Sequence, residues 1–222
     1  MMMRILLALI LLLSGPTAVA AGSGGGGGVS MPSSVAQTPE QIAAGHYKSG
    51  LRYKKRAWKQ EEKAAKASTP KKRDKLLAKA AKNYEKALNK YIETLRADRQ
   101  HHKAANELGY SLRKAGRYEQ AIQWYDRALE LKPGFLEAIE YRGEAYLALG
   151  KIDAAKGAYM ELFRNDQALA DQLLVAMEAW LGQQASGSVE STDVGGFSEW
   201  LIERRELAGI TRDVSLIQSR QW

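Results

Sequence analysis

The strongest constraint on this chain is an internal repeat, in which small and aromatic residues recur at a spacing of 34 between residues 102 and 167. The recurring residue types are those that let helices pack closely. The charged residues differ between the two copies, as where Glu107 of the first copy is matched by Tyr141 of the second. A fixed period of this length is typical of stacked helical units that bury their faces against one another. The matched pairs are Gly109 and Gly143, Gly116 and Gly150, Ala121 and Ala155, and Tyr125 and Tyr159.

Each copy predicts two helices joined by a tight turn. In the first copy, residues 103–115 and 118–131 carry apolar residues at helical spacing. Gly116 is expected to end the first helix as a left-handed cap, and Pro133 with Gly134 ends the second. The small residues Gly109 and Ala121 would let the two helices approach closely.

These features resemble the tetratricopeptide repeat, whose helix–turn–helix unit has the same period. The first copy places Leu108, Gly109, Gly116, Tyr118, Ala121, Tyr125, Ala128 and Pro133 where the family pattern has such residues, with Ala105 in place of the usual Trp. The second copy keeps Gly143, Tyr146, Ala155 and Tyr159, with Arg142 in place of Leu and Gln167 in place of Pro. A weaker match lies upstream, where Tyr84, Ala87 and Tyr91 stand 34 residues before Tyr118, Ala121 and Tyr125.

The resemblance implies an all-α fold: a short tetratricopeptide-like helical solenoid with an N-terminal basic helical extension and a C-terminal capping helix. The expected segments are a signal peptide over 1–20, a Gly/Ser-rich linker over 21–38, the basic extension over 39–70, a degenerate first repeat over 71–101, repeats over 102–135 and 136–169, the capping helix over 170–184, a linker over 185–196, and a C-terminal helix and tail over 197–222.

The first 20 residues have the pattern of a secretory signal. Arg4 precedes an apolar run over 5–13, and small residues at 18–20 precede the expected cleavage after Ala20, a cut after Ala21 being equally acceptable. The alternative is a membrane anchor, but the run is short of the roughly 20 residues that span a bilayer. We therefore expect a periplasmic or secreted bacterial protein. The chain has no Cys, which excludes lipobox lipidation and disulfides.

A linker precedes the first predicted helix. The five glycines at 24–28 lack the Lys and Ser or Thr of a phosphate-binding loop, so they indicate a flexible linker. Thr38 and Pro39 are expected to begin a basic helix, or two helical pieces given Gly45 and Gly50, and Pro70 marks the next boundary.

The C-terminal part predicts a short helix over 197–207 and a weakly ordered tail over 209–222. The aromatic residues Phe197 and Trp200 are expected to dock on the repeats or, alternatively, to form a partner-binding segment.

Charge is distributed unevenly along the chain. Residues 46–104 hold 19 Lys and Arg against 6 Asp and Glu, a balance of +13, whereas residues 105–222 hold 13 against 18, a balance of −5. The basic segment could meet an acidic protein, an anionic lipid surface or nucleic acid, or be a solvated helical surface. Nucleic acid is the least expected of these partners if the chain is exported.

No residue pattern predicts catalysis or a metal site. His46 is isolated, and the side chains of the adjacent His101 and His102 should diverge. Glu137, Glu140 and Glu144 are spaced to share one helical face, where a solvated or ligand-facing stripe is more expected than an acid/base pair. We expect neither an enzyme nor a cofactor.

In the family that this chain resembles, the first helix of each unit lines a concave groove. That register places these residues on the groove side: Lys103, Asn106, Tyr110, Arg113 and Lys114 in the first copy, and Glu137, Glu140, Glu144 and Leu147 in the second. Such a groove would orient a charged peptide, unless its basic and acidic sets neutralise each other or the basic N-terminal helix covers the acidic one. The family's carboxylate clamp for chaperone tails is not reproduced, because Glu137 stands where Asn is needed.

The resulting prediction is a non-catalytic protein–protein interaction scaffold or adaptor of the bacterial cell envelope, with a peptide or protein partner in the groove. The alternative is a peripheral binder of anionic lipid or another polyanion, using the basic surface between Lys48 and Lys90.

Overall fold

The described part of the chain consists of helices without strands. The computed structural model describes residues 37–185 and 194–219, so the predicted signal segment lies outside it. This confirms the predicted all-α class for the residues described. The helices are α1 (Pro39–Ala65), α2 (Pro70–Ala97), α3 (His102–Lys114), α4 (Tyr118–Leu131), α5 (Leu136–Ala148), α6 (Ile152–Asn165), α7 (Gln167–Ala185) and α8 (Val194–Ser219).

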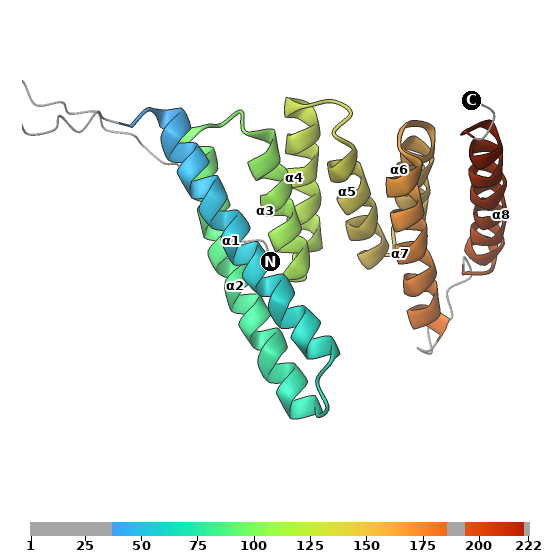
Figure 1. The fold of residues 1–222 in the computed structure, drawn as a ribbon, viewed down its shortest axis with the longest axis horizontal. Helices are drawn as coiled ribbons and strands as arrows, with labels where there is room; N and C mark the ends of the chain where they lie inside the picture. The colour runs from blue at the N-terminus through green and yellow to red at the C-terminus, as the bar shows by residue number, and fades with distance from the viewer. Residues whose placement is uncertain (1–36, 186–193, 220–222) are drawn as a thin grey trace, which may run out of the picture. The chain divides into compact units, whose positions relative to one another are not determined.

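Consecutive helices pair and stack in chain order, as Figure 1 shows. The turns inside the two clear repeats close on Gly116 and Gly150, whose φ angles are 75° and 66°. These left-handed conformations favour glycine, which explains why both residues recur at the repeat spacing. In the first copy, α3 and α4 agree to within one residue with the helices predicted over 103–115 and 118–131.

The core repeats with the same period as the sequence. Ala87, Ala121 and Ala155 are fully buried on successive second helices. One turn further along, Tyr91, Tyr125 and Tyr159 are also fully buried. Because Ala87 and Tyr91 of α2 are buried in the same way as their counterparts in the two clear repeats, the weak upstream match reflects real packing.

The long helices α1 and α2 form an antiparallel hairpin that extends past α3 and α4 (Figure 1). The Thr38 side chain accepts a hydrogen bond from the backbone of Gln41 and begins α1, which then continues unbroken through both of its glycines. Gly50 is needed there, because an added Cβ would lie 2.4 Å from Cε1 of Tyr91. A Cβ added to Gly109 of α3 would likewise lie 2.7 Å from Cε1 of Tyr125 in α4. Helix α1 therefore packs against α2 as the first helix of a repeat packs against the second.

The C-terminal helices close the array. Phe197 and Leu201 of α8 are buried, and the Trp200 ring lies edge-on to Tyr159 at 5.3 Å. The expected docking of these aromatic residues is confirmed. The sequence predicts that this helix ends near residue 207 and is followed by a weakly ordered tail. This prediction is wrong as far as Ser219, because α8 continues through Gly209 to that residue. A reason lies in the residue pattern, since apolar residues recur with helical spacing at Leu207, Ile210, Val214 and Ile217.

Among residues 37–185 and 194–219, no helix combines the length and the apolar character that crossing a bilayer requires.

Candidate functional site

A groove of about 400 Å³ runs between the C-terminal ends of α3, α5 and α7. Four of the residues predicted from the repeat register line it: Arg113, Lys114, Glu144 and Leu147. The remaining lining comes from Tyr118 and Ala148 and from one side of α7, namely Ala176, Ala179, Trp180 and Gln183. The groove lining thus combines aliphatic side chains with the aromatic side chains of Tyr118 and Trp180, the latter of which we call its aromatic wall, and with the charged side chains of Arg113, Lys114 and Glu144, which we call its charged rim.

The basic and acidic residues predicted for opposite ends of the groove meet inside it. The Arg113 guanidinium of α3 forms an ion pair with Glu144 of α5. It also lies over the rings of Tyr110 and Tyr141, at 5.2 and 5.5 Å from their centroids. Ring contacts of this kind hold the guanidinium in one orientation. Self-neutralisation, one of the two alternatives that the sequence left open, therefore applies to this pair.

Glu140 lies one helical turn from Glu144 and is only 4 % exposed. Burial raises the pKa of its carboxyl to about 8, and the charge of neighbouring Glu144 adds to this effect. The protonated form of Glu140 is therefore favoured over a wider pH range than in an exposed carboxyl, while Glu144 pairs with Arg113. The predicted stripe of three carboxylates consequently presents less negative charge than its sequence implies.

Helix α1 supplies further partners to α3. Lys54 Nζ lies 2.6 Å from Glu107 Oε1, and Lys114 Nζ lies 2.7 Å from Glu61 Oε1. The partners of α1 in these pairs are residues of α3 rather than the acidic residues of α5. The basic extension therefore docks on the first clear repeat, a relationship that repeat spacing alone could not reveal.

An aromatic cluster secures the same contact. Trp58 Nε1 donates a hydrogen bond to the Tyr110 hydroxyl oxygen at 2.7 Å, and the Tyr84 hydroxyl donates one to Glu61 Oε2 at 2.9 Å. The Tyr110 ring packs edge-on against Tyr141, at a centroid distance of 5.2 Å. Tyr110, predicted to contact a ligand, is 7 % exposed and is part of the packing.

The other predicted groove residues do not line the groove. Asn106 is buried at 4 % exposure, and its Oδ1 has no hydrogen-bond partner in the described part of the chain. Lys103 and Glu137 are exposed. Tyr146, one of the residues that match the repeat pattern in the second copy, is partly buried and packs against the C-terminal core.

The aromatic wall of the groove was missed as a site feature by the sequence reasoning. Trp180 belongs to the segment predicted as the capping helix over 170–184, for which no site residue was predicted. It is partly buried, lies edge-on to Phe197 at 5.9 Å and also lines the groove. The available signal was the spacing of four residues between Ala176 and Trp180, which places both on one face of the helix, and both line the groove.

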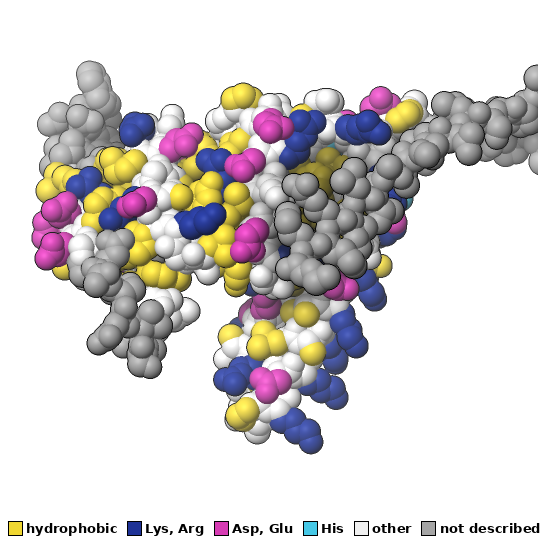
Figure 2. Space-filling model, turned by 180° about the vertical axis from the view of Figure 1, so that it is seen from behind, with side chains coloured by type: hydrophobic (Ala, Val, Ile, Leu, Met, Phe, Trp, Pro, Cys, Tyr) yellow, Lys and Arg dark blue, Asp and Glu magenta, His cyan; other side chains and the backbone are white. Residues whose placement is uncertain are grey.

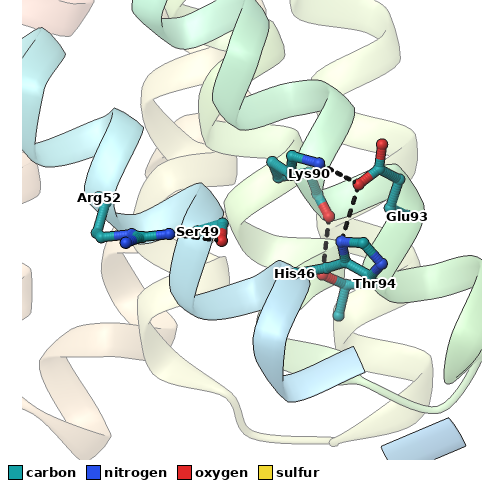
Figure 3. Close-up of polar contacts among 6 residues, drawn as sticks. All are labelled: His46, Ser49, Arg52, Lys90, Glu93 and Thr94. Carbon is teal, nitrogen blue, oxygen red and sulfur yellow. Dashed lines mark hydrogen bonds and ion pairs between the residues drawn. The ribbon is translucent and has the colours of Figure 1, made fainter. Parts of the chain in front are cut away.

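The three histidines have structural contacts. His46 Nδ1 lies 2.8 Å from Glu93 Oε2, which also accepts a hydrogen bond from Lys90, as Figure 3 shows. His101 Nδ1 accepts a hydrogen bond from the Ala104 backbone and caps α3, while His102 packs edge-on to Phe135. The two adjacent rings thus diverge as expected. Within the described residues, no group of three or more metal-binding side chains comes together.

Comparison with known proteins identifies the repeats. Two tetratricopeptide-repeat family models match, one over residues 76–134 and the other over residues 112–177. A curated relative, the heat shock protein sti1 homolog of Schizosaccharomyces pombe, is 29% identical over 119 residues, which are 53% of this chain. The match covers 19% of that relative, so the chain spans about a fifth of its length.

Two solved structures are also similar. One is the first tetratricopeptide domain of Spaghetti (RPAP3) bound to an HSP90 peptide, with 19% identity, a TM-score of 0.41 and coverage of 60% of this chain and 94% of that one. The other is the Sgt2 tetratricopeptide domain of Aspergillus fumigatus, with 18% identity, a TM-score of 0.36 and coverage of 69% and 81%. The two overlapping family matches, together with the buried series at a period of 34 residues, show that this chain is a tetratricopeptide-repeat protein over residues 76–177.

Proposed function

We propose that this protein is a non-catalytic interaction scaffold that binds a segment of a partner protein in the groove between α3, α5 and α7. The observation that carries the proposal is the lining of that groove, in which Leu147, Ala148 and Ala179 form an apolar floor beside Trp180. Small side chains leave room for those of a ligand, and an aromatic wall offers a large contact area with little conformational freedom to lose.

The charged rim favours an extended segment that carries polar groups beside its apolar ones. The guanidinium of Arg113 is already paired with Glu144, so a ligand carboxylate would compete with an internal partner. Lys114 is exposed and pairs with Glu61 at 2.7 Å, a contact that solvent weakens. We therefore expect contacts with Trp180 and the small side chains to act together with the polar side chains of the lining, and the rim to orient the segment.

The proposed setting is the bacterial cell envelope. It rests on the signal-like pattern of residues 1–20 and is independent of the groove. Fractionation of cells that express the full chain, followed by N-terminal sequencing of the product, tests this part of the proposal. A product that begins at Ala21 or Gly22 in the periplasmic fraction is expected, and an uncleaved cytosolic product would contradict it.

The groove is tested by filling it without disturbing the core. Ala148 and Ala179 are exposed residues of its lining, so Ala148→Arg with Ala179→Arg adds two bulky side chains there. Ala168→Arg is the matched control, because it changes an exposed alanine of α7 that does not line the groove. The chain from Ala21 onward serves as bait in envelope extract, and the affinity of each captured protein is then measured with purified components.

The expected result is a discrete protein partner that binds the wild type and the control but loses at least tenfold in affinity for the groove variant. Equal affinity for all three chains would overturn the groove as the binding site. The tetratricopeptide fold would stand in either case.

A further inference from the structure

The α1–α2 hairpin carries two basic stripes that the groove does not use. On α1, Lys and Arg follow one another every three or four residues at Lys48, Arg52, Lys55, Lys59 and Lys63, all of them exposed. On α2, the corresponding series is Lys71, Lys75, Lys79, Lys82, Lys86 and Lys90, exposed except for the half-buried Lys90. This spacing keeps each series on one side of its helix, and the series span roughly 22 and 28 Å at 1.5 Å per residue.

The stripes point away from the faces that build the fold. The buried positions of α1 include Gly50, Ala57 and Ala64, and those of α2 include Ala80 and Ala87. Ala57 lies two residues from both Lys55 and Lys59, which places it on the opposite side of the helix. The cations therefore have no role in packing the hairpin against α3.

The α2 stripe approaches the basic surface of α1 at Lys86. The Tyr53 ring of α1 lies beneath Arg56 of the same helix, at 5.4 Å, and beneath Lys86 of α2, at 5.8 Å. Cations from both helices thus converge on one aromatic ring. Figure 2 shows Lys and Arg side chains gathered along the projecting hairpin.

Within the described residues, Lys90 of the α2 series forms an ion pair with an acidic neighbour, and the Glu62 carboxylate lies within electrostatic reach of Lys59 and Lys63. Glu93 accepts a hydrogen bond from Lys90 at 2.5 Å and also contacts His46 (Figure 3). Arg52 donates a hydrogen bond to the hydroxyl of Ser49, which carries no charge. Within the part of the chain that the structure describes, no ion pair involves the remaining lysines of the two stripes, so their charge is available to a partner.

We propose that the basic band formed by these two stripes binds the surface of an anionic phospholipid bilayer. The residues are mainly lysines, which act as point charges rather than as shaped phosphate clamps. The aromatic ring that the cations of both helices meet, Tyr53, is half-buried beneath Arg56 and Lys86, which leaves it poorly placed to stack on a nucleic-acid base. A long straight band matches a plane of headgroups, and residues 1–20, if they direct export, bring the chain to a membrane. This surface is distinct from the groove, so a scaffold could hold its partner while lying on a bilayer.

The composition of the band predicts how binding should depend on lipid charge and on salt. Because every position of the two stripes is Lys or Arg, the attachment that they provide should be electrostatic and reversible, with the exposed Trp58 and Leu77 of the hairpin as its apolar neighbours. It should increase with the fraction of anionic lipid and disappear when salt screens the charges. Each lysine near an anionic surface contributes about 1 kcal/mol, so the loss of four should lower the partition coefficient roughly a hundredfold or more.

The test is flotation of the chain from Ala21 onward with vesicles of phosphatidylcholine that contain 0 or 30 mol % phosphatidylglycerol, at 50 and 500 mM NaCl. The stripe variant changes Lys71, Lys75, Lys79 and Lys82 to Gln. The matched control changes Arg117, Lys132, Lys151 and Arg164 to Gln, which removes the same charge from exposed positions outside the hairpin. Circular dichroism establishes that both variants fold.

The expected result is flotation of the wild type and the control with anionic vesicles at low salt, and loss of flotation for the stripe variant. An equal loss in both variants would show that net charge alone is responsible, which overturns the band. Flotation with neutral vesicles, or survival at 500 mM NaCl, would also overturn it. Tighter binding to a 30-base single- or double-stranded oligonucleotide than to anionic vesicles would replace the bilayer with nucleic acid as the partner.

Discussion

Lys54 Nζ and Glu107 Oε1 lie 2.6 Å apart, and the two side chains are only 9% and 11% exposed. This ion pair connects α1 to α3 across 53 residues of sequence. Because both charges have left water, each depends on the other for compensation. The pair therefore fixes how the hairpin docks on the first clear repeat, and it gives the most direct test of that docking.

We predict that Lys54→Met destabilises the protein by about 3 kcal/mol, because it leaves the Glu107 carboxylate buried without a cation. The double variant Lys54→Met with Glu107→Leu should recover most of that loss, since an apolar pair needs no compensation. Urea unfolding measures both. The control is Lys66→Ala at the exposed Lys66–Glu62 pair, which should change stability by less than about 0.5 kcal/mol. A cost below about 1 kcal/mol for Lys54→Met would show that the pair is not buried in solution.

Sequence reasoning could predict the repeat but not this docking. Tyr91, Tyr125 and Tyr159 are all fully buried because a fixed period places the same residue in the same packing environment. Lys54 and Glu107 belong to no period, and their pairing depends on how α1 crosses α3. The repeat carries no signal for this pair, because Glu107 is matched by Tyr141 at the 34-residue spacing and so belongs to none of the recurring packing positions.

The candidate groove was predictable to a similar extent. The repeat register correctly brings residues of α3 and α5 to one surface, and Arg113, Glu144 and Leu147 line it together. The same register says nothing about α7, which lies outside the two clear copies yet provides the wall with Trp180. Helix spacing also cannot show that Tyr110 is covered by α1, since that contact joins residues 52 positions apart.

The two glycines of α1 give a second prediction. Gly50→Ala should destabilise the protein by about 1–3 kcal/mol, because the new Cβ would lie 2.4 Å from the fully buried Tyr91 ring. Gly45→Ala should stabilise it by about 0.5–1 kcal/mol, since nothing lies within 4 Å and alanine favours the helix. Thermal unfolding of the two variants provides the comparison. If both stabilise the protein, α1 does not pack against α2 as a repeat helix does.

The buried carboxyl of Glu140 gives a pH-dependent prediction. Its pKa is about 8 in the folded protein against an ordinary value of 4.5, so the folded state holds the proton more tightly than the unfolded state. Its contribution to stability is therefore complete below about pH 4.5 and is lost as the pH rises towards 8. Glu140→Gln keeps the shape of the side chain and removes the titration.

The melting temperature of Glu140→Gln should consequently exceed that of the wild type by a margin that grows between pH 5 and pH 8 and then levels off. The stabilisation at pH 8.5 should be on the order of 2 kcal/mol. Glu137→Gln is the control, because Glu137 is exposed on the same helix and should show no such trend. A difference between wild type and Glu140→Gln that does not vary with pH would mean that Glu140 is ionised throughout this range.

The final prediction concerns the attachment of α8. Phe197 is fully buried, its ring lies 5.9 Å from that of Trp180, and Arg205 of the same helix pairs with Glu178 of α7. Removing a buried phenyl group costs about 3–5 kcal/mol. Because α8 is the last described helix, we expect Phe197→Ala to release it locally while the repeats stay folded.

Hydrogen exchange measured by mass spectrometry should show faster exchange over residues 194–219 in Phe197→Ala and unchanged protection over α3 to α6. Ile202→Ala is the control, because that side chain is 59% exposed and its loss should leave α8 in place. Unchanged exchange in Phe197→Ala would mean that α8 is held by other contacts. Since Trp180 contacts Phe197 and also lines the groove, release of α8 should free this ring and weaken binding of the partner. Weaker binding in this variant would show that the C-terminal helix supports the proposed site.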